Sequence, residues 1–434
     1  MNRKILNLAL PNVISNITVP LLSMVDLAVL GHLESEVYIG AIAIGGIIFN
    51  FIYWGFGFLR MGTSGLTAQA YGARNKVEMS LTFARAAGVA ISSALLIWIL
   101  QVPIAKVSFL LLEASPEVES LASSYFYIRI YAAPATIGLY ALSGWFLGMQ
   151  NARYPMILAI TVNLLNIGFN LLFVLVLGMK SDGVALGTVL AQYSGLVLGV
   201  ILFIGKYRGY SAYWNLKDVM VWPDLKKFFL VNRDILIRTL LLLLVFAFFT
   251  SKSAGINDTV LAVNTLLLQF LFIFSYFIDG YANAAEALSG RFIGAGQRGS
   301  FTRALKLLFY WGVGIAAGFT LAYVFAGKYI LRILTDNPDL IELSREYLPW
   351  IGFIPVVSFA AFIWDGVYAG ATATAAMRNA MIIATIVIFL PTSILGLKYF
   401  DSHGLWFSML FFMMSRSVIL SVMYKRSVLK RFTV

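Results

Sequence analysis

The residue with the most specific chemistry in this chain is Asp26, which lies in an apolar stretch, LLSMVDLAVLG. An ionised aspartate at the centre of a bilayer costs about 2.5–3.5 kcal/mol on insertion scales, so such residues are rare and mark ion or proton pathways. Burial favours the neutral acid. Asp26 could therefore take up and release a proton or coordinate a sodium ion, and packing against a neighbouring helix is the alternative.

Three polar residues elsewhere in the first half are candidate partners of Asp26. Asn166 and Asn170 are four residues apart, which places them on one face of a helix. Thr188 follows in the next apolar segment and could join them. The alternative is a set of hydrogen bonds between helices, worth about 0.6 kcal/mol each in membranes.

Two prolines precede Asp26 in the same segment, Pro11 and Pro20. Proline removes a backbone hydrogen bond and permits a kink. We expect either a passive kink or a hinge that responds to protonation of Asp26.

The second half has its own charges in apolar segments, Arg238, Asp279, Glu286 and Asp365. Opposite charges at similar depth favour structural ion pairs, with a cation-binding role as the alternative. Asp234 and Arg238 are four residues apart and could pair along one helix.

Aromatic and methionine side chains are the candidates for a substrate-binding cleft. Aromatic faces attract organic cations by about 0.5–2 kcal/mol each, and methionine adapts to varied ligands. The expected cleft residues are Met24, Tyr53, Met61, Phe248 and Tyr276.

The composition requires these residues to be positioned by membrane-spanning helices. The chain has 434 residues, of which 60% are hydrophobic and 12% charged, against about 25% charged in soluble domains. Its net charge of +12 is spread over alternate helix connections rather than gathered on one face, which argues against nucleic-acid binding. There are no cysteines and only two histidines, and no phosphate loop, HExxH pair or elbow serine is found, so neither a metal, a cofactor nor an enzyme is expected.

Stretches of about 20 apolar residues predict twelve transmembrane helices and thus an all-α integral membrane protein. They cover residues 5–31, 38–60, 78–105, 119–147, 154–178, 183–206, 228–251, 259–288, 301–326, 342–369, 376–397 and 404–424. The first segment is long enough to span and is predicted to be retained rather than cleaved. Excess Lys and Arg in alternate connections predicts that both termini are cytoplasmic.

The sequence repeats itself at an offset of 222 residues. Gly72, Gly144 and Gly148 recur as Gly294, Gly366 and Gly370, whereas Asp26 corresponds to Phe248. This predicts two pseudo-symmetric six-helix lobes, at 1–206 and 228–434, joined by a cytoplasmic linker at 207–227.

Four motifs in this chain resemble the multidrug and toxic compound extrusion family, in particular its DNA-damage-inducible protein F branch. They are PNVISNITVPLLSMVDLAVLGHL (11–33), RMGTSGLTAQAYGARN (60–75), NRDILIRT (232–239) and DGYANAAEALSGRFIGAG (279–296). The resemblance implies twelve helices in two lobes around a V-shaped cleft and cation-coupled export of drugs.

The resemblance also bears on single residues. In proton-coupled members a first-helix aspartate works with polar residues of helices five and six, and Asp26, Asn166 and Thr188 match them. Asn170 stands where some relatives carry a second aspartate, so Asp26 would be the sole titrating group of the cluster.

The sequence therefore predicts a proton-coupled antiporter that expels amphipathic, mostly cationic drugs or toxic metabolites from a bacterial inner membrane, working as a monomer in the lipid bilayer. One alternative is sodium coupling, which the resemblance ties to acids of the second lobe. Another is a flippase for a lipid-linked anion with Arg129 and Arg238 as phosphate ligands. A channel fits poorly with a two-lobed repeat.

Overall fold

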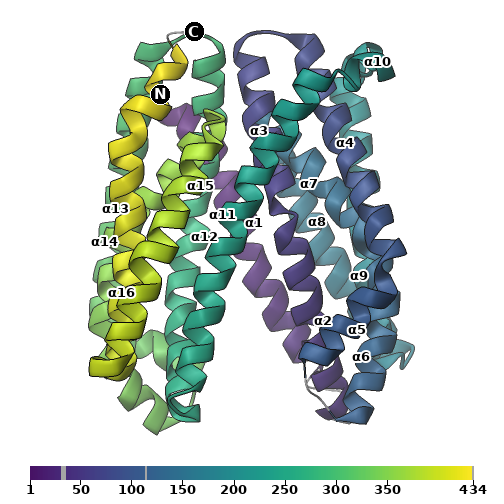
Figure 1. Cartoon of the computed structure of the whole chain (residues 1–434). Coiled ribbons are helices and arrows are strands. Elements are labelled where there is room, and N and C mark those ends of the chain that lie inside the picture. Colours follow the sequence, from purple (N-terminus) through teal and green to yellow (C-terminus); the bar gives the residue numbers. More distant parts are fainter. Residues whose placement is uncertain (31–35, 113–114, 433–434) are drawn as a thin grey trace. The chain divides into compact units, whose positions relative to one another are not determined.

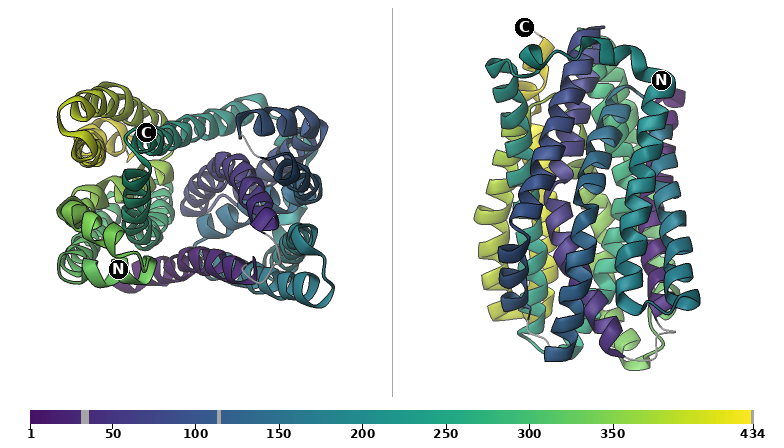
Figure 2. Two further views of the ribbon diagram at one scale, coloured as in Figure 1. Left: turned by 90° about the horizontal axis from the view of Figure 1, so that it is seen from below. Right: turned by 90° about the vertical axis from the view of Figure 1, so that its right-hand side faces the viewer.

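The computed structural model of this chain consists of helices joined by short connections (Figure 1). It describes residues 1–30, 36–112 and 115–432; within these ranges, the side chains of Val19, residues 21–30, Glu36 and Leu216 lie outside the description. Seen along their axes, the helices of each part of the chain gather into a bundle (Figure 2).

The first half contains six crossings and the connection that follows them. Its elements are α1 (Asn2–Leu30), α2 (Glu36–Gly55), α3 (Gly57–Gly72), α4 (Lys76–Ile99), α5 (Gln101–Leu111), α6 (Pro116–Arg129), η1 (Ile130–Ala132), α7 (Ala133–Gly148), α8 (Arg153–Asn170), η2 (Leu171–Val176), α9 (Lys180–Tyr207), η3 (Arg208–Tyr213) and α10 (Leu216–Val219). Elements α2–α3, α6–α7 and α8–η2 each form one continuous crossing.

The second half repeats the pattern with longer helices. Its elements are α11 (Trp222–Ala254), α12 (Asp258–Gly294), α13 (Arg298–Leu334), α14 (Pro338–Gly370), α15 (Thr374–Ile382), η4 (Ile383–Phe389), α16 (Leu390–Ser427) and η5 (Leu429–Phe432). Asp401, with φ 45° and ψ −127°, breaks α16 into two arms. The arms fold back on each other, since a Cβ on Gly404 would lie 2.2 Å from the Gly396 carbonyl oxygen.

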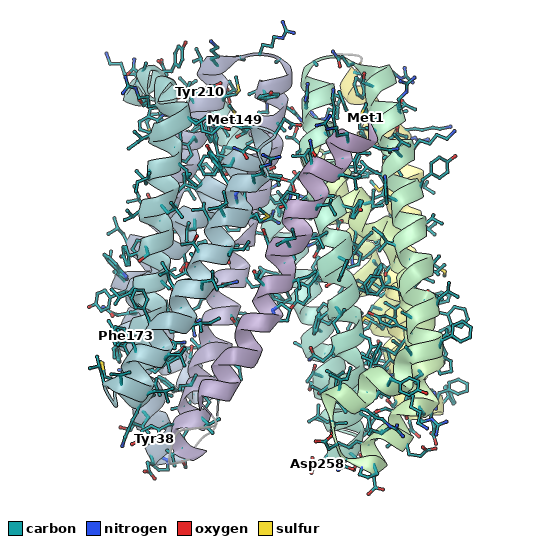
Figure 3. All side chains as sticks on the ribbon, turned by 180° about the vertical axis from the view of Figure 1, so that it is seen from behind. Met1, Tyr38, Met149, Phe173, Tyr210 and Asp258 are labelled. Atoms are coloured by element: carbon teal, nitrogen blue, oxygen red, sulfur yellow. The ribbon has the colours of Figure 1, made fainter. Side chains whose placement is uncertain are left out.

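The number of crossings agrees with the predicted twelve. Among the residues that the structure describes in full, ten helical stretches are long and apolar enough to cross a membrane. The last, Thr374–Phe432, contains two crossings because it reverses at Asp401, and α1 adds another by its length and apolar sequence. Apolar side chains such as Phe325 (76% exposed) point outward, as a lipid environment requires, and Figure 3 shows side chains standing off the helices along their length.

The chain packs into two compact units. One holds Ile14–Tyr71 and Asn75–Phe228, and we call it the N unit; the other holds Met1–Val13, Gly72–Arg74 and Phe229–Val434, and we call it the C unit. The boundary after Phe228 lies one residue past the predicted linker. That these units move as lobes stays a prediction.

The internal repeat is visible in the helix packing of each unit. A Cβ on Gly144 would lie 2.3 Å from the Arg60 carbonyl oxygen, and one on Gly366 would lie 2.0 Å from the Ala282 carbonyl oxygen. Arg60 and Ala282 are themselves 222 residues apart. The same crossing, α3 on α7 and α12 on α14, is therefore built twice from glycines that let the backbones touch.

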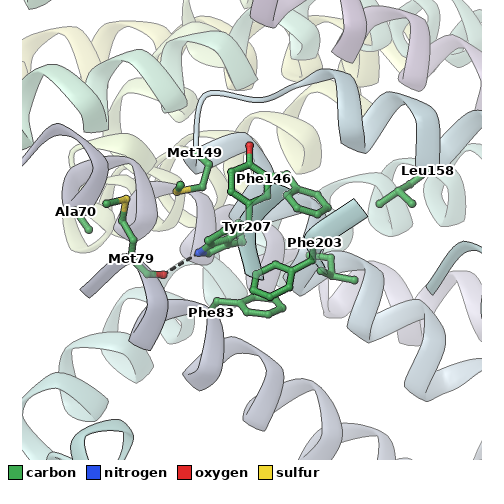
Figure 4. Packing of buried hydrophobic residues seen from close by; sticks show 10 residues of the cluster. Ala70, Met79, Phe83, Phe146, Met149, Leu158, Phe203 and Tyr207 are labelled. Carbon is green, nitrogen blue, oxygen red and sulfur yellow. Dashed lines mark hydrogen bonds between the residues drawn. The ribbon is translucent and has the colours of Figure 1, made fainter. Parts of the chain in front are cut away.

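The predicted linker is folded onto the N unit. An aromatic core of Phe83, Trp145, Phe203 and Tyr207 packs beneath it, and the Trp145 indole donates to the Met79 carbonyl at 2.8 Å (Figure 4). Ser80 donates its hydroxyl proton to the Tyr210 carbonyl at 2.5 Å. These contacts hold η3 against α4, so the connection is structured.

The buried Arg85 of α4 binds the part of the linker that follows η3. Its guanidinium binds the carboxylates of Glu78 at 2.9 Å and Asp224 at 3.2 Å. It also donates to the carbonyls of Asp218 and Val219, both in α10, at 3.2 Å. A single side chain thus joins α4, α10 and the start of α11.

Candidate functional site

The polar side chains of α8 form a continuous chain of hydrogen bonds in the N unit. Asn170 donates from Nδ2 to Asn166 Oδ1 at 3.1 Å, and Asn166 donates from Nδ2 to the Thr188 hydroxyl of α9 at 3.0 Å. Thr188 in turn donates to the Val184 carbonyl at 2.9 Å. Asn166 and Asn170 are buried, so the three residues grouped by the sequence lie together and hold their amides in fixed orientations.

The close approach of α8 and α9 depends on Gly187, which precedes Thr188. A Cβ on Gly187 would lie 2.4 Å from Asn170 Oδ1 and 3.3 Å from the Asn170 backbone nitrogen. Only glycine leaves room for Asn170 here. Gly187 was not among the residues predicted from the sequence, although a glycine next to a polar residue in an apolar segment is a signal of helix contact.

Asn163 extends the polar face of α8 to α1. It lies three residues before Asn166, and its Nδ2 donates to the Thr18 hydroxyl of α1 at 2.8 Å. This contact was also missed, because nothing in the sequence pairs residues 145 positions apart.

The Thr18–Asn163 contact fixes the height of Asp26 relative to the polar cluster. The first and fifth crossings run in the same direction through the membrane. Asp26 lies eight residues after Thr18, about 12 Å along α1, and Asn170 lies seven residues after Asn163, about 10 Å along α8. The backbone of Asp26 is therefore level with Asn170, while the side chains of Asp26 and Met24 lie outside the described residues.

Helix α1 changes units between the two predicted hinge residues. Residues 1–13, with Pro11, belong to the C unit, and residues from Ile14 on, with Pro20, belong to the N unit. The part in the C unit is held by α12: Asn283 Nδ2 donates to Asn12 Oδ1 at 3.4 Å, and a Cβ on Gly280 would lie 2.8 Å from the Val13 nitrogen. Pro11 and Pro20 thus flank the residue at which the helix passes from one unit to the other.

The C unit contains a buried cluster of charges. Asp365 Oδ2 of α14 accepts from Arg416 Nη2 of α16 at 2.6 Å and also from Arg238 Nη2 of α11. Asp279 lies in α12 of the same unit. Asp365 is thus shared by two arginines from two other helices.

Arg416, 2% exposed, was missed by the sequence analysis. Its signal is present, since it is the one charge in the stretch FFMMSRSVIL. Glu286 lies seven residues after Asp279 in α12 and is fully buried where α12 crosses α14 at Gly370.

The expected pairing of Asp234 with Arg238 along one helix is wrong. Asp234 Oδ1 instead accepts from Arg378 Nη1 at 2.7 Å and from Arg233 Nη2 at 3.1 Å. Arg238 binds Asp365, because α14 brings a carboxylate to it at the same depth.

The expected substrate-binding side chains are divided between the units. Tyr53 is buried and stacks on Phe49 at 5.6 Å, and Met61 is half-buried in α3. In the C unit, Phe248 packs edge-on against Phe389 at 5.7 Å, and Tyr276 is half-buried in α12.

An all-helical membrane chain with repeated halves, a polar cluster in one half and a charge cluster in the other is typical of a secondary transporter. The chain belongs to the MatE family of multidrug and toxic compound extrusion transporters, whose model matches residues 11–172 and 235–395, once in each half.

Two named relatives are similar to most of this chain. The DNA damage-inducible protein F of Escherichia coli (strain K12) is 37% identical over 97% of this chain and 91% of its own length. The human multidrug and toxin extrusion protein 1 is 25% identical over 80% of this chain and 60% of its own.

Solved structures share the fold. The Vibrio cholerae MATE transporter VcmN in the bent form has a TM-score of 0.85 at 16% identity, covering 99% of this chain and 97% of that one. The eukaryotic MATE transporter AtDTX14 has a TM-score of 0.85 at 16% identity, covering 100% of this chain and 98% of that one.

Proposed function

We propose that this protein is a proton-coupled antiporter that exports amphipathic, mostly cationic organic compounds across a bacterial inner membrane, with Asp26 as the proton-binding group. The observation that carries the proposal is the path of α1. This helix is held by the C unit up to Val13, is tied to the polar face of α8 at Thr18, and brings Asp26 level with Asn170.

A change of charge at Asp26 would act on α1. The neutral acid prefers an apolar environment, whereas the carboxylate needs hydrogen-bond donors. Asn170 donates an amide N–H to Asn166, and Asn166 donates one to Thr188, so a charge at Asp26 would compete with an existing network. Bending at Pro11 or Pro20 would let α1 change its path when the charge of Asp26 changes. The transport cycle would be completed when Asp26 releases its proton to the cytoplasm.

The driving force is sufficient for export. Each elementary charge moved across 100 mV is worth about 2.3 kcal/mol, equivalent to a roughly 50-fold gradient. If a monovalent cation exchanges for one proton, the electrical contribution cancels and the pH gradient drives export.

Two acids of the C unit, Asp365 and Asp234, are poorly placed to bind sodium. The resemblance ties sodium coupling to acids of the second lobe, but Asp365 and Asp234 are each bound by two arginines. A sodium ion would have to displace a guanidinium. Arg238 is likewise occupied by Asp365, which weakens the alternative of a phosphate-binding flippase.

The test is proton flux in sodium-free proteoliposomes on addition of ethidium, an amphipathic organic cation. Wild type is expected to release lumenal protons, Asp26→Asn is expected to release none, and Asp258→Asn, which removes an exposed acid at the start of α12, is expected to match wild type. Full flux in Asp26→Asn would refute the assignment and turn attention to Asp279, Glu286 and Asp365. Flux that requires sodium would establish the sodium-coupled alternative.

A further inference from the structure

Arg129 in the N unit is a membrane-embedded arginine without a carboxylate partner among the residues that the structure describes. Its Nη1 donates to the Tyr125 hydroxyl at 2.5 Å, and its guanidinium lies over the rings of Phe49 and Tyr125, at 5.1 and 5.5 Å from their centroids. Its Nε is buried and has no acceptor in the described part of the chain. The rings hold this charge in place but do not neutralise it.

The backbone around Arg129 is fixed by contacts on its other side. Helix α6 ends at Arg129, and Pro134 in the next turn lacks the N–H that would bond the Ile130 carbonyl. Trp98 Nε1 donates to that carbonyl at 3.1 Å, and the Tyr193 hydroxyl donates to the Tyr131 carbonyl at 3.0 Å. The break in the helix therefore has its carbonyls satisfied, and Arg129 is presented from a rigid turn.

Two buried hydroxyls lie beside this arginine. Tyr53 stacks on Phe49, the ring over which the Arg129 guanidinium lies, with ring centroids 5.6 Å apart. The hydroxyl of Thr136 lies near that of Tyr53. Neither oxygen makes a hydrogen bond of ordinary geometry with the described residues. Both residues are buried, at 8% exposure, so water does not readily replace the missing partner. A second arginine, Arg60, acts on the neighbouring Tyr140.

The group has more donors than acceptors. Arginine can only donate, whereas tyrosine and threonine hydroxyls each donate one proton and can also accept. A buried polar group left without a partner costs about 1–3 kcal/mol, so such a cluster favours a ligand that brings acceptors. A planar carboxylate or a sulfonate matches the guanidinium fork.

The other half of the repeat has no counterpart. At the 222-residue offset, Tyr53, Arg129 and Thr136 correspond to Ser275, Ile351 and Ser358. The charge belongs to the N unit alone, whereas the arginines Arg238 and Arg416 of the C unit bind Asp365.

We propose that Arg129, with the hydroxyls of Tyr53 and Thr136, binds the acidic group of an amphipathic organic anion, so that the exporter also accepts compounds carrying a carboxylate or sulfonate. This inference rests on the proposed function, because it names a second class of exported compound. Arg129 and Arg60 are both half-buried, which leaves their charges partly accessible to a ligand.

The test is calorimetric titration of the purified full-length protein with naphthalene-1-sulfonate and with its neutral analogue 1-naphthalenemethanol. Wild type is expected to bind the sulfonate at least tenfold more tightly than the alcohol. Arg129→Gln is expected to lose that preference, and Arg129→Lys, which keeps the charge but not the fork, to retain part of it. Arg153→Gln, which removes an exposed arginine at the start of α8, is expected to bind as wild type does.

Thr136→Val leaves the charge of Arg129 in place and nearly keeps the shape of the side chain at 136. It therefore tests the site if Arg129→Gln fails to fold. It is expected to weaken sulfonate binding several-fold with no effect on the alcohol. Equal binding of the sulfonate by wild type, Arg129→Gln and Thr136→Val would overturn the proposal, as would equal binding of the two naphthalenes by wild type. Displacement of the sulfonate by phosphatidylglycerol but not by phosphatidylcholine would assign the site to a lipid headgroup and overturn the substrate assignment.

This experiment is independent of the coupling mechanism because it uses no gradient. If Asp26→Asn keeps full proton flux while sulfonate binding depends on Arg129, the proposed coupling fails and the anion site stands. If Asp26→Asn abolishes flux while sulfonate binding ignores Arg129, the anion site fails and the coupling stands.

Discussion

Asn163 of α8 donates a hydrogen bond to the hydroxyl of Thr18 in α1 at 2.8 Å, eight residues before Asp26. This contact ties the helix that carries the acid to the helix that carries the amides. It lies on the N-unit side of the point at which α1 leaves the C unit.

Removal of this tether should weaken coupling without unfolding the protein. Thr18→Val and Asn163→Leu each delete a hydrogen bond of the kind that averages about 0.6 kcal/mol in membranes, so we expect drug-stimulated proton flux to fall about threefold. The double variant should fall no further than either single one. Thr265→Val, which changes an exposed threonine of α12 bonded within its own helix, is the control. Additive losses in the double variant would show that the two residues act separately.

Gly187→Ala should destabilise the N unit. The added Cβ would lie 2.4 Å from Asn170 Oδ1, and overpacking of this kind costs about 1–3 kcal/mol. Gly205→Ala in the same helix is the matched control, because a Cβ there meets nothing within 4 Å and alanine is the better helix former by about 1 kcal/mol. Thermal unfolding in detergent should show a lower Tm for the first and an unchanged or higher Tm for the second. Equal Tm values would mean that α8 and α9 pack less tightly than they do here.

Asp365→Asn should be among the most destabilising single changes in the C unit. It leaves Arg238 and Arg416 buried without their shared counter-ion, and breaking a buried pair by removing one partner costs about 3–5 kcal/mol. Adding Arg416→Met to it should restore part of the loss, because one uncompensated charge is removed. Arg345→Gln, in the exposed pair with Glu342, should cost less than about 1 kcal/mol. Tm measurements on the four proteins test this, and a double variant less stable than Asp365→Asn would contradict it.

Arg85→Gln should release the connection between the halves. The side chain holds Glu78, Asp224 and the carbonyls of α10 together. Its loss should loosen the backbone around the exposed Lys217, Lys226 and Lys227, so trypsin should cleave there more readily. We expect trypsin to cleave the variant into its two halves at least tenfold faster than wild type, as followed by gel electrophoresis. Lys306→Gln, on exposed α13, is the control. Unchanged cleavage would mean that the aromatic core under η3 holds the connection by itself.

Features that lie along one helix or recur at a fixed offset could be predicted from the amino-acid sequence. Hydropathy located the twelve crossings because each needs about 20 apolar residues in a row. The 222-residue offset predicted the repeat that the glycine contacts at Gly144 and Gly366 display. The spacing of Asn166 and Asn170 put them on one face, since helical geometry is the same everywhere.

Which helix faces meet depends on the three-dimensional packing of the chain. Asp365 pairs with Arg416 across 51 positions and with Arg238 across 127, Asp234 pairs with Arg378 across 144, and Asn163 reaches Thr18 across 145. Helical spacing places each side chain on a face, but the partner of that face depends on where backbones can approach. Small residues such as Gly144 and Gly280 set those approaches, and their effect is exerted between helices distant in sequence.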